Sequence, residues 1–163
     1  MIDAETQNTA DLYRLALLLT GRCDLSIDIA ADAVVSPEAG GSRRTVIGKA
    51  LAAIRAELDT SASRTRTADV HKSAAAPRGW SLPVGATRAL IENALLAIGA
   101  FPRAAVLLLI FEGVRLAEAA ALLNADAALV WKAQAIGLRE FTANLAAWKP
   151  QTSIGPSPLP ASI

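Results

Sequence analysis

The chain has 163 residues, of which 53% are hydrophobic and 4% are aromatic, and its formal net charge at neutral pH is +1. This length permits one domain or two small ones, and the low net charge excludes a strongly basic protein that nucleic acid would attract through its overall field. The apolar content is mostly alanine and leucine, which favour helix over strand, so we expect an all-α protein.

The charges are distributed unevenly along the chain. Residues 1–42 carry two basic and seven acidic side chains, a net charge of −5, whereas residues 43–78 carry eight basic and three acidic ones, a net charge of +5. The remaining residues carry six basic and five acidic side chains, a net charge of +1. This value is low for a domain that grips phosphates, which argues against strong DNA binding.

Three amphipathic helices are predicted in the first third of the chain. They cover about 8–20, 25–35 and 44–58. Each helix presents one apolar stripe, so the three can close a small core. We therefore assign residues 1–58 to a first helical domain.

The next segment, residues 59–83, is rich in Ser, Thr, Ala, Arg and Pro and has no sustained apolar period, which is typical of a linker. A second helical domain is predicted over residues 84–148, and the proline-rich residues 149–163 are expected to be a disordered tail. The expected architecture is two small helical domains joined by a flexible linker.

The second domain contains the most informative pattern of the sequence. A helix predicted over 85–98 precedes a second one that starts near Pro102, ends at Gly113 and is apolar on every side, so that neighbours must enclose it. A short helix, a turn at 124–126 and a long helix follow. The expected core positions of the short helix are Leu116, Ala119, Ala120 and Leu123. This arrangement predicts a helix-turn-helix.

Two blocks of the sequence resemble the extracytoplasmic-function group of bacterial sigma factors. The first, LYRLALLLTGRCDLSIDIAADAV at residues 12–34, is similar to the opening of region two of these proteins. The second, about 95–145, is similar to region four, with FPR at 101–103 and EAA at 118–120. The resemblance implies a divergent sigma factor with a shortened region two. It also implies RNA polymerase or an anti-sigma protein as the partner.

The polymerase-facing helix that the resemblance implies carries Asp28 and Asp32. These residues are one helical turn apart and share a helix face, where they can meet basic side chains of a partner. The alternative is an ordinary solvated helix surface.

The residues expected to read DNA are few. The segment 36–58 contains no aromatic residue, although the family melts promoter DNA with an aromatic and basic helix. On the second helix of the helix-turn-helix, the candidate DNA contacts are Lys132, Gln134 and Arg139. Specific DNA binding is therefore expected to be weak.

An apolar strip is expected beside the core positions of the same helix. The predicted core positions are Val130, Gln134, Gly137, Phe141 and Leu145. The adjacent strip consists of Trp131, Ala135, Leu138 and Thr142. Because an exposed apolar strip usually marks an interaction site, we predict that Trp131, Ala135 and Leu138 bind a protein partner or form a homodimer seam.

Three functions are compatible with these patterns. The leading hypothesis is a sigma-factor-like protein in bacterial transcription initiation or regulation, which contacts RNA polymerase and promoter DNA. The alternative is a sigma mimic or adaptor that binds an anti-sigma factor, polymerase or itself without binding DNA. The third is a helical scaffold that shares only its fold with sigma factors.

Catalysis and cofactor binding are not expected. The sequence contains no nucleophile elbow, glycine-rich phosphate loop, zinc signature or paired catalytic carboxylates, and its one histidine, His71, has no second ligand at a suitable spacing. We therefore expect no enzyme, no metal site and no cofactor. The single cysteine, Cys23, and the absence of a leader or a long apolar run predict a cytoplasmic protein without membrane insertion.

Overall fold

A computed structural model describes residues 2–35, 41–68 and 87–147. Every regular element in these ranges is helical, which confirms the predicted all-α class. The elements are α1 (Ile2–Thr20), α2 (Cys23–Val35), α3 (Ser42–Ala53), α4 (Arg55–Thr67), α5 (Arg88–Leu96), α6 (Ala100–Val106), a π-helical segment (Leu107–Phe111), α7 (Leu116–Leu123) and α8 (Ala127–Ala147). No helix of the described residues combines the length and the apolar character needed to cross a membrane.

The first three helices pack against one another through their apolar stripes. The corner between α1 and α2 is made by Gly21, whose φ of 70° suits a residue without a β-carbon. Next to this corner, the hydroxyl oxygens of the buried residues Thr20 and Ser26 lie 3.0 Å apart. These three helices therefore form the packed group that their periodicity predicts.

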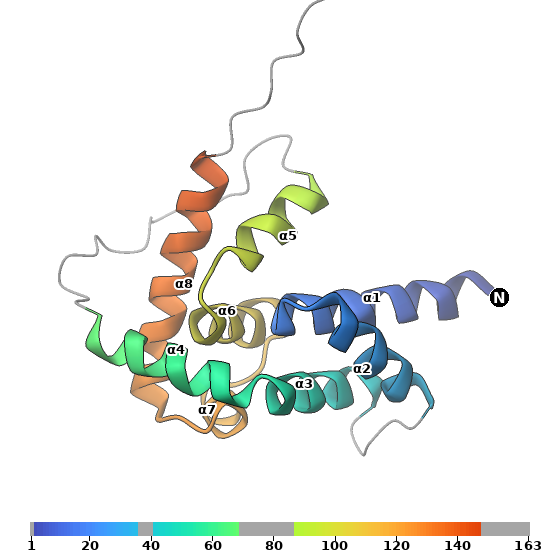
Figure 1. The fold of residues 1–163 in the computed structure, drawn as a ribbon, viewed down its shortest axis with the longest axis horizontal. Coiled ribbons are helices and arrows are strands. Elements are labelled where there is room, and N and C mark those ends of the chain that lie inside the picture. The colour runs from blue at the N-terminus through green and yellow to red at the C-terminus, as the bar shows by residue number, and fades with distance from the viewer. Residues whose placement is uncertain (1, 36–40, 69–86, 148–163) are drawn as a thin grey trace, which may run out of the picture.

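The predicted bounds of the third helix, 44–58, were wrong. In the structure α3 starts at Ser42 and the chain bends at Ile54, after which α4 continues to Thr67. In Figure 1 these two helices follow one another along one side of the molecule. Residues 59–67, expected to begin the linker, are thus helical, and residues 69–83 lie outside the described residues.

The segment that forms α4 is rich in Ser and Thr, which is typical of a linker, and yet it is helical. Its hydroxyl groups bond to carbonyl oxygens of the preceding turn, as Thr60 does to Ala56 and Thr65 to Ser61, both at 2.9 Å. Ser61 and Thr65 are buried, and the Ser61 hydroxyl accepts a hydrogen bond from the backbone N–H of Phe101 at 3.1 Å. A polar face of α4 therefore packs inward.

The centre of the molecule is α6, all seven residues of which are buried. It packs against α4 and α8, and α8 crosses it closely at Gly137. A β-carbon on Gly137 would lie 2.7 Å from the carbonyl oxygen of Pro102 and 2.8 Å from a methyl group of Val106. The prediction that neighbours enclose the apolar helix holds for α6 and for Leu107 and Leu108, but it is wrong for the end of the apolar run, where Ile110 and Phe111 are exposed.

Arg103 on α6 links both parts of the chain. It is 4% exposed and donates to the carbonyl oxygens of Leu19, Leu96 and Ile98 at 3.3, 3.2 and 3.0 Å. These carbonyls lie at or just beyond the C-terminal ends of α1 and α5, where the helix dipole is negative. Burial lowers the pKa of Arg103 below its usual value.

The helices assigned to two domains share buried residues. One hydrophobic cluster extends from Leu12 on α1 through Leu58 on α4 and Phe101 on α6 to Leu145 on α8. Ion pairs join the same helices at the surface, with Arg43 and Arg44 on α3 paired to Glu112 and to Glu118 on α7. The division into two domains stays a prediction, and in this structure the two groups of helices pack together.

Candidate interaction surface

The helix-turn-helix formed by α7, residues 124–126 and α8 has the bounds that the sequence predicts. Asn124 ends α7 in the left-handed conformation, with a φ of 51°. Asp126 caps the N-terminus of α8, because its carboxylate accepts a hydrogen bond from the backbone N–H of Leu129 at 2.7 Å. This carboxylate also places a negative charge at the helix end that would otherwise attract a phosphate.

The inner side of α8 is broader than predicted. Four of the five predicted core positions, Val130, Gly137, Phe141 and Leu145, are buried, whereas Gln134 is half-buried. Residues Leu129, Ala133 and Ile136 are buried as well. About two residues per turn of α8 therefore face the neighbouring helices. Leu129, Ala133 and Ile136 belong to this stripe, although they were not among the predicted core positions.

The outer side of α8 carries an exposed tryptophan among alanines. The Trp131 side chain is 63% exposed, and Ala127, Ala128 and Ala135 are exposed around it. We call these four residues the α8 outer face. Leu138, predicted to extend this surface, is half-buried and packs against the core, and Thr142 is half-buried too. The apolar strip is therefore shorter than predicted.

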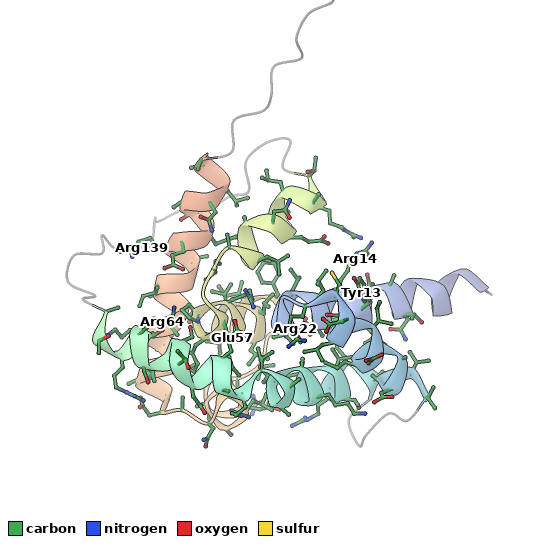
Figure 2. All side chains as sticks on the ribbon, viewed as in Figure 1. Tyr13, Arg14, Arg22, Glu57, Arg64 and Arg139 are labelled. Carbon is green, nitrogen blue, oxygen red and sulfur yellow. The ribbon has the colours of Figure 1, made fainter. Side chains whose placement is uncertain are left out.

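The three candidate DNA contacts differ in their exposure and in their contacts. The Lys132 ammonium group donates to the backbone carbonyl oxygen of Arg66 at 2.9 Å, at the C-terminal end of α4. Gln134 is half-buried, and Arg139 is exposed. Figure 2 shows Arg139 on α8 at the same side of the molecule as Arg64 on α4. That α4 reaches this helix was not predicted, because residues 59–67 were assigned to the linker.

A second surface lies on α2. Asp28 and Asp32 are exposed on one side of the helix, and Asp32 forms an ion pair with Lys49 on α3 at 3.0 Å. Ile27, Val34 and Val35 on the same helix are also exposed, Val35 to 81%. Val34 is exposed because Ile29, Ala30 and Ala33 fill the inner side of the helix. We call Ile27, Asp28, Asp32, Val34 and Val35 the α2 outer face.

The ion pairs near these surfaces hold α3 against the C-terminal helices. The Arg43 guanidinium binds both carboxylate oxygens of Glu112 at 2.5 and 2.6 Å, and this hydrogen bonding raises the pKa of Arg43. Arg44 binds Glu118 at the start of α7 at 2.7 Å. Glu118 is therefore engaged within the molecule, at a position where helix-turn-helix proteins approach the DNA backbone.

The described residues contain no group of three or more His, Cys, Asp and Glu side chains that could hold a metal ion. Cys23 is exposed and not in a disulfide, and His71 lies outside the described residues. Comparison with known protein families, with curated proteins and with solved structures finds no match to this chain.

Proposed function

We propose that this chain is a sigma-factor-like protein of bacterial transcription control that contacts protein partners through the α8 and α2 outer faces and does not read DNA in a sequence-specific way. The sigma resemblance of residues 12–34 and 95–145 and the helix-turn-helix of α7 and α8 support a role in transcription. The partner of both outer faces is RNA polymerase.

The observation that carries this proposal is the exposure of Trp131. In a helix-turn-helix the exposed face at the start of the second helix meets the major groove, and base recognition there needs bidentate hydrogen-bonding side chains. The α8 outer face offers an indole and three alanines. Exposed tryptophans are strongly favoured at the centres of protein interfaces, because a large rigid side chain buries much surface at a low cost in entropy.

Charge also favours a protein partner over DNA. Each cation that neutralises a phosphate contributes salt-dependent affinity, so that a DNA reader needs several of them on one face. Lys132 donates to a carbonyl of α4, and Asp126 and Glu118 add negative charge at the N-terminal ends of α8 and α7. The mixed acidic and apolar character of the α2 outer face suits a basic and apolar partner surface.

The experiment compares two ligands for the intact chain and its variants. Fluorescence anisotropy measures binding to duplex DNA of random and of selected sequence at low salt, and biolayer interferometry measures binding to bacterial RNA polymerase core enzyme. We expect no site preference on DNA. We expect polymerase binding that Trp131→Ala weakens by about tenfold or more, while the matched variant Ala146→Ser, at an exposed position outside the α8 outer face, leaves it unchanged.

Two results would overturn the proposal. One is a preference for a particular DNA sequence of about a hundredfold that Lys132→Ala abolishes, which would mean that the helix reads bases. The other is polymerase binding that neither Trp131→Ala nor charge reversal on α2 alters. Circular dichroism of each variant checks that the helices remain folded.

A further inference from the structure

A cavity of about 520 Å³ opens between the N-terminal and the C-terminal helices. It is lined by residues of α1, α3 and α5, by the π-helical segment and by Glu112 beyond it. We propose that this cavity binds a small amphipathic anion, with an aliphatic or aromatic body and one carboxylate group. The proposal is independent of the function proposed above, because neither the α8 nor the α2 outer face lines the cavity.

The floor of the cavity is apolar. Leu15 on α1, Leu95 on α5 and Leu107 at the start of the π-helical segment are buried, and the half-buried Leu18 and the exposed Phe111 form its walls. Ligand pockets of this size are usually lined mostly by hydrophobic side chains with a few polar groups that fix orientation. The body of the ligand would lie on this floor.

The rim is charged, and one cation on it has no counter-charge among the described residues. Asp11 lies 3.2 Å from the guanidinium of Arg14, and Glu92 lies 3.7 Å from it. Arg43 holds Glu112 on the other side. Figure 2 shows Arg14 on the side of α1 that faces α5. Each carboxylate of the rim thus already has a cation within ion-pair distance.

Arg88 is the remaining cation of the rim. It is the first residue of α5 and is exposed, and its side chain forms no ion pair or hydrogen bond with the residues that the structure describes. Its guanidinium can form two parallel hydrogen bonds with a carboxylate. The charges of the six charged side chains of the rim sum to zero. The preference for an anionic head group therefore comes from the unpaired N–H donors of Arg88 and not from the net charge.

A π-helical turn borders the cavity, and Phe111 and Glu112 at its end belong to the lining. At the end of the π-helical segment, the backbone N–H of Glu112 donates to the carbonyl oxygen of Leu107 at 2.9 Å, and the N–H of Val114 donates to that of Leu108 at 2.8 Å. Gly113 then reverses the chain with a φ of 65°. Such π-helical turns occur often at functional sites because the extra residue redirects side chains. Here the turn brings Phe111 and Glu112 to the mouth of the cavity.

The experiment titrates the intact chain with three ten-carbon probes that share one body: decanoate, decanol and decyltrimethylammonium. Calorimetry measures each dissociation constant, and we expect about 1 mM or tighter for decanoate, with weaker binding of the other two. Arg88→Glu is expected to weaken decanoate about tenfold and to leave decanol unchanged. Arg64→Glu, the same change on an exposed arginine outside the cavity, is the matched control.

A second variant tests the location of the body. Leu18→Trp fills the cavity and should abolish binding of all three probes, and circular dichroism checks its fold. Because Arg88 is exposed, its variant remains informative if Leu18→Trp does not fold. Absence of decanoate binding, equal binding of all three head groups, preference for the cationic probe, or binding unaffected by Arg88→Glu would each overturn the proposal.

Discussion

Arg103 keeps a positive charge inside the protein without a carboxylate at ion-pair distance among the described residues. Its compensation comes from three carbonyl oxygens of α1, α5 and the turn between α5 and α6. Arginine suits this position because its donors are fixed in a fork that can reach several acceptors at once. One side chain thereby satisfies carbonyl groups that helix ends leave without partners.

We predict that Arg103→Met lowers the free energy of unfolding by about 2 kcal/mol, because three buried carbonyl groups lose their donor while the cost of burying a cation is relieved. Urea denaturation followed by circular dichroism measures the change. The control Arg64→Met, at an exposed arginine of α4, should alter stability by less than about 0.5 kcal/mol. A stability equal to or above that of the wild-type chain would show that the carbonyl contacts contribute nothing.

Two helical glycines differ in what surrounds them. Gly137→Ala places a methyl group 2.7 Å from a backbone oxygen of α6, which the rigid helix cannot easily move. We predict a loss of about 2 kcal/mol in the free energy of unfolding. Gly48 on α3 has no atom within 4 Å of its would-be β-carbon, so Gly48→Ala should instead stabilise the chain by roughly 0.5 kcal/mol.

Urea denaturation of this pair separates steric conflict from helix propensity. The same substitution is expected to act with opposite signs at the two positions. Stabilisation by Gly137→Ala would mean that α6 and α8 do not cross as closely as the structure places them.

At the scale of the helix, α2 offers a test of its charged side. Asp28→Arg on the α2 outer face is expected to weaken binding to RNA polymerase core enzyme about tenfold, because it opposes the basic surface proposed for the partner. Asp59→Arg on α4 makes the same change of charge at another exposed position and should have little effect. Interferometry on immobilised polymerase measures both, and equal losses for the two variants would refute a specific role of α2.

The turn of the helix-turn-helix could be predicted from the sequence, whereas α4 could not. Asn124 and Asp126 have local preferences, for the left-handed conformation and for the first position of a helix, that fix where α7 ends and α8 begins. In α4, Ser and Thr are as common in turns as in helices, and tertiary contacts such as the hydrogen bond from the Phe101 N–H to Ser61 cannot be predicted from the local sequence. The exposure of Trp131 followed from its place beside the core stripe, but the partial burial of Leu138 depends on packing against residues distant in the sequence.

At the scale of the whole molecule, the continuous core predicts that the two groups of helices open together. The buried amides of Leu51 on α3 and of Val106 on α6 should exchange with solvent through the same global unfolding and give equal opening free energies. Native-state hydrogen exchange measures both values. A difference of more than about 1 kcal/mol would mean that the helices of residues 2–67 and 88–147 unfold as separate units.

The most direct test of the central claim follows the Trp131 side chain itself. With Trp80 and Trp148 replaced by phenylalanine and the chain labelled with 5-fluorotryptophan, the fluorine NMR spectrum contains one signal, that of Trp131. If the α8 outer face binds protein, RNA polymerase core enzyme broadens or shifts this signal and duplex DNA of mixed sequence leaves it unchanged. A shift with DNA and an unchanged signal with polymerase would contradict the account.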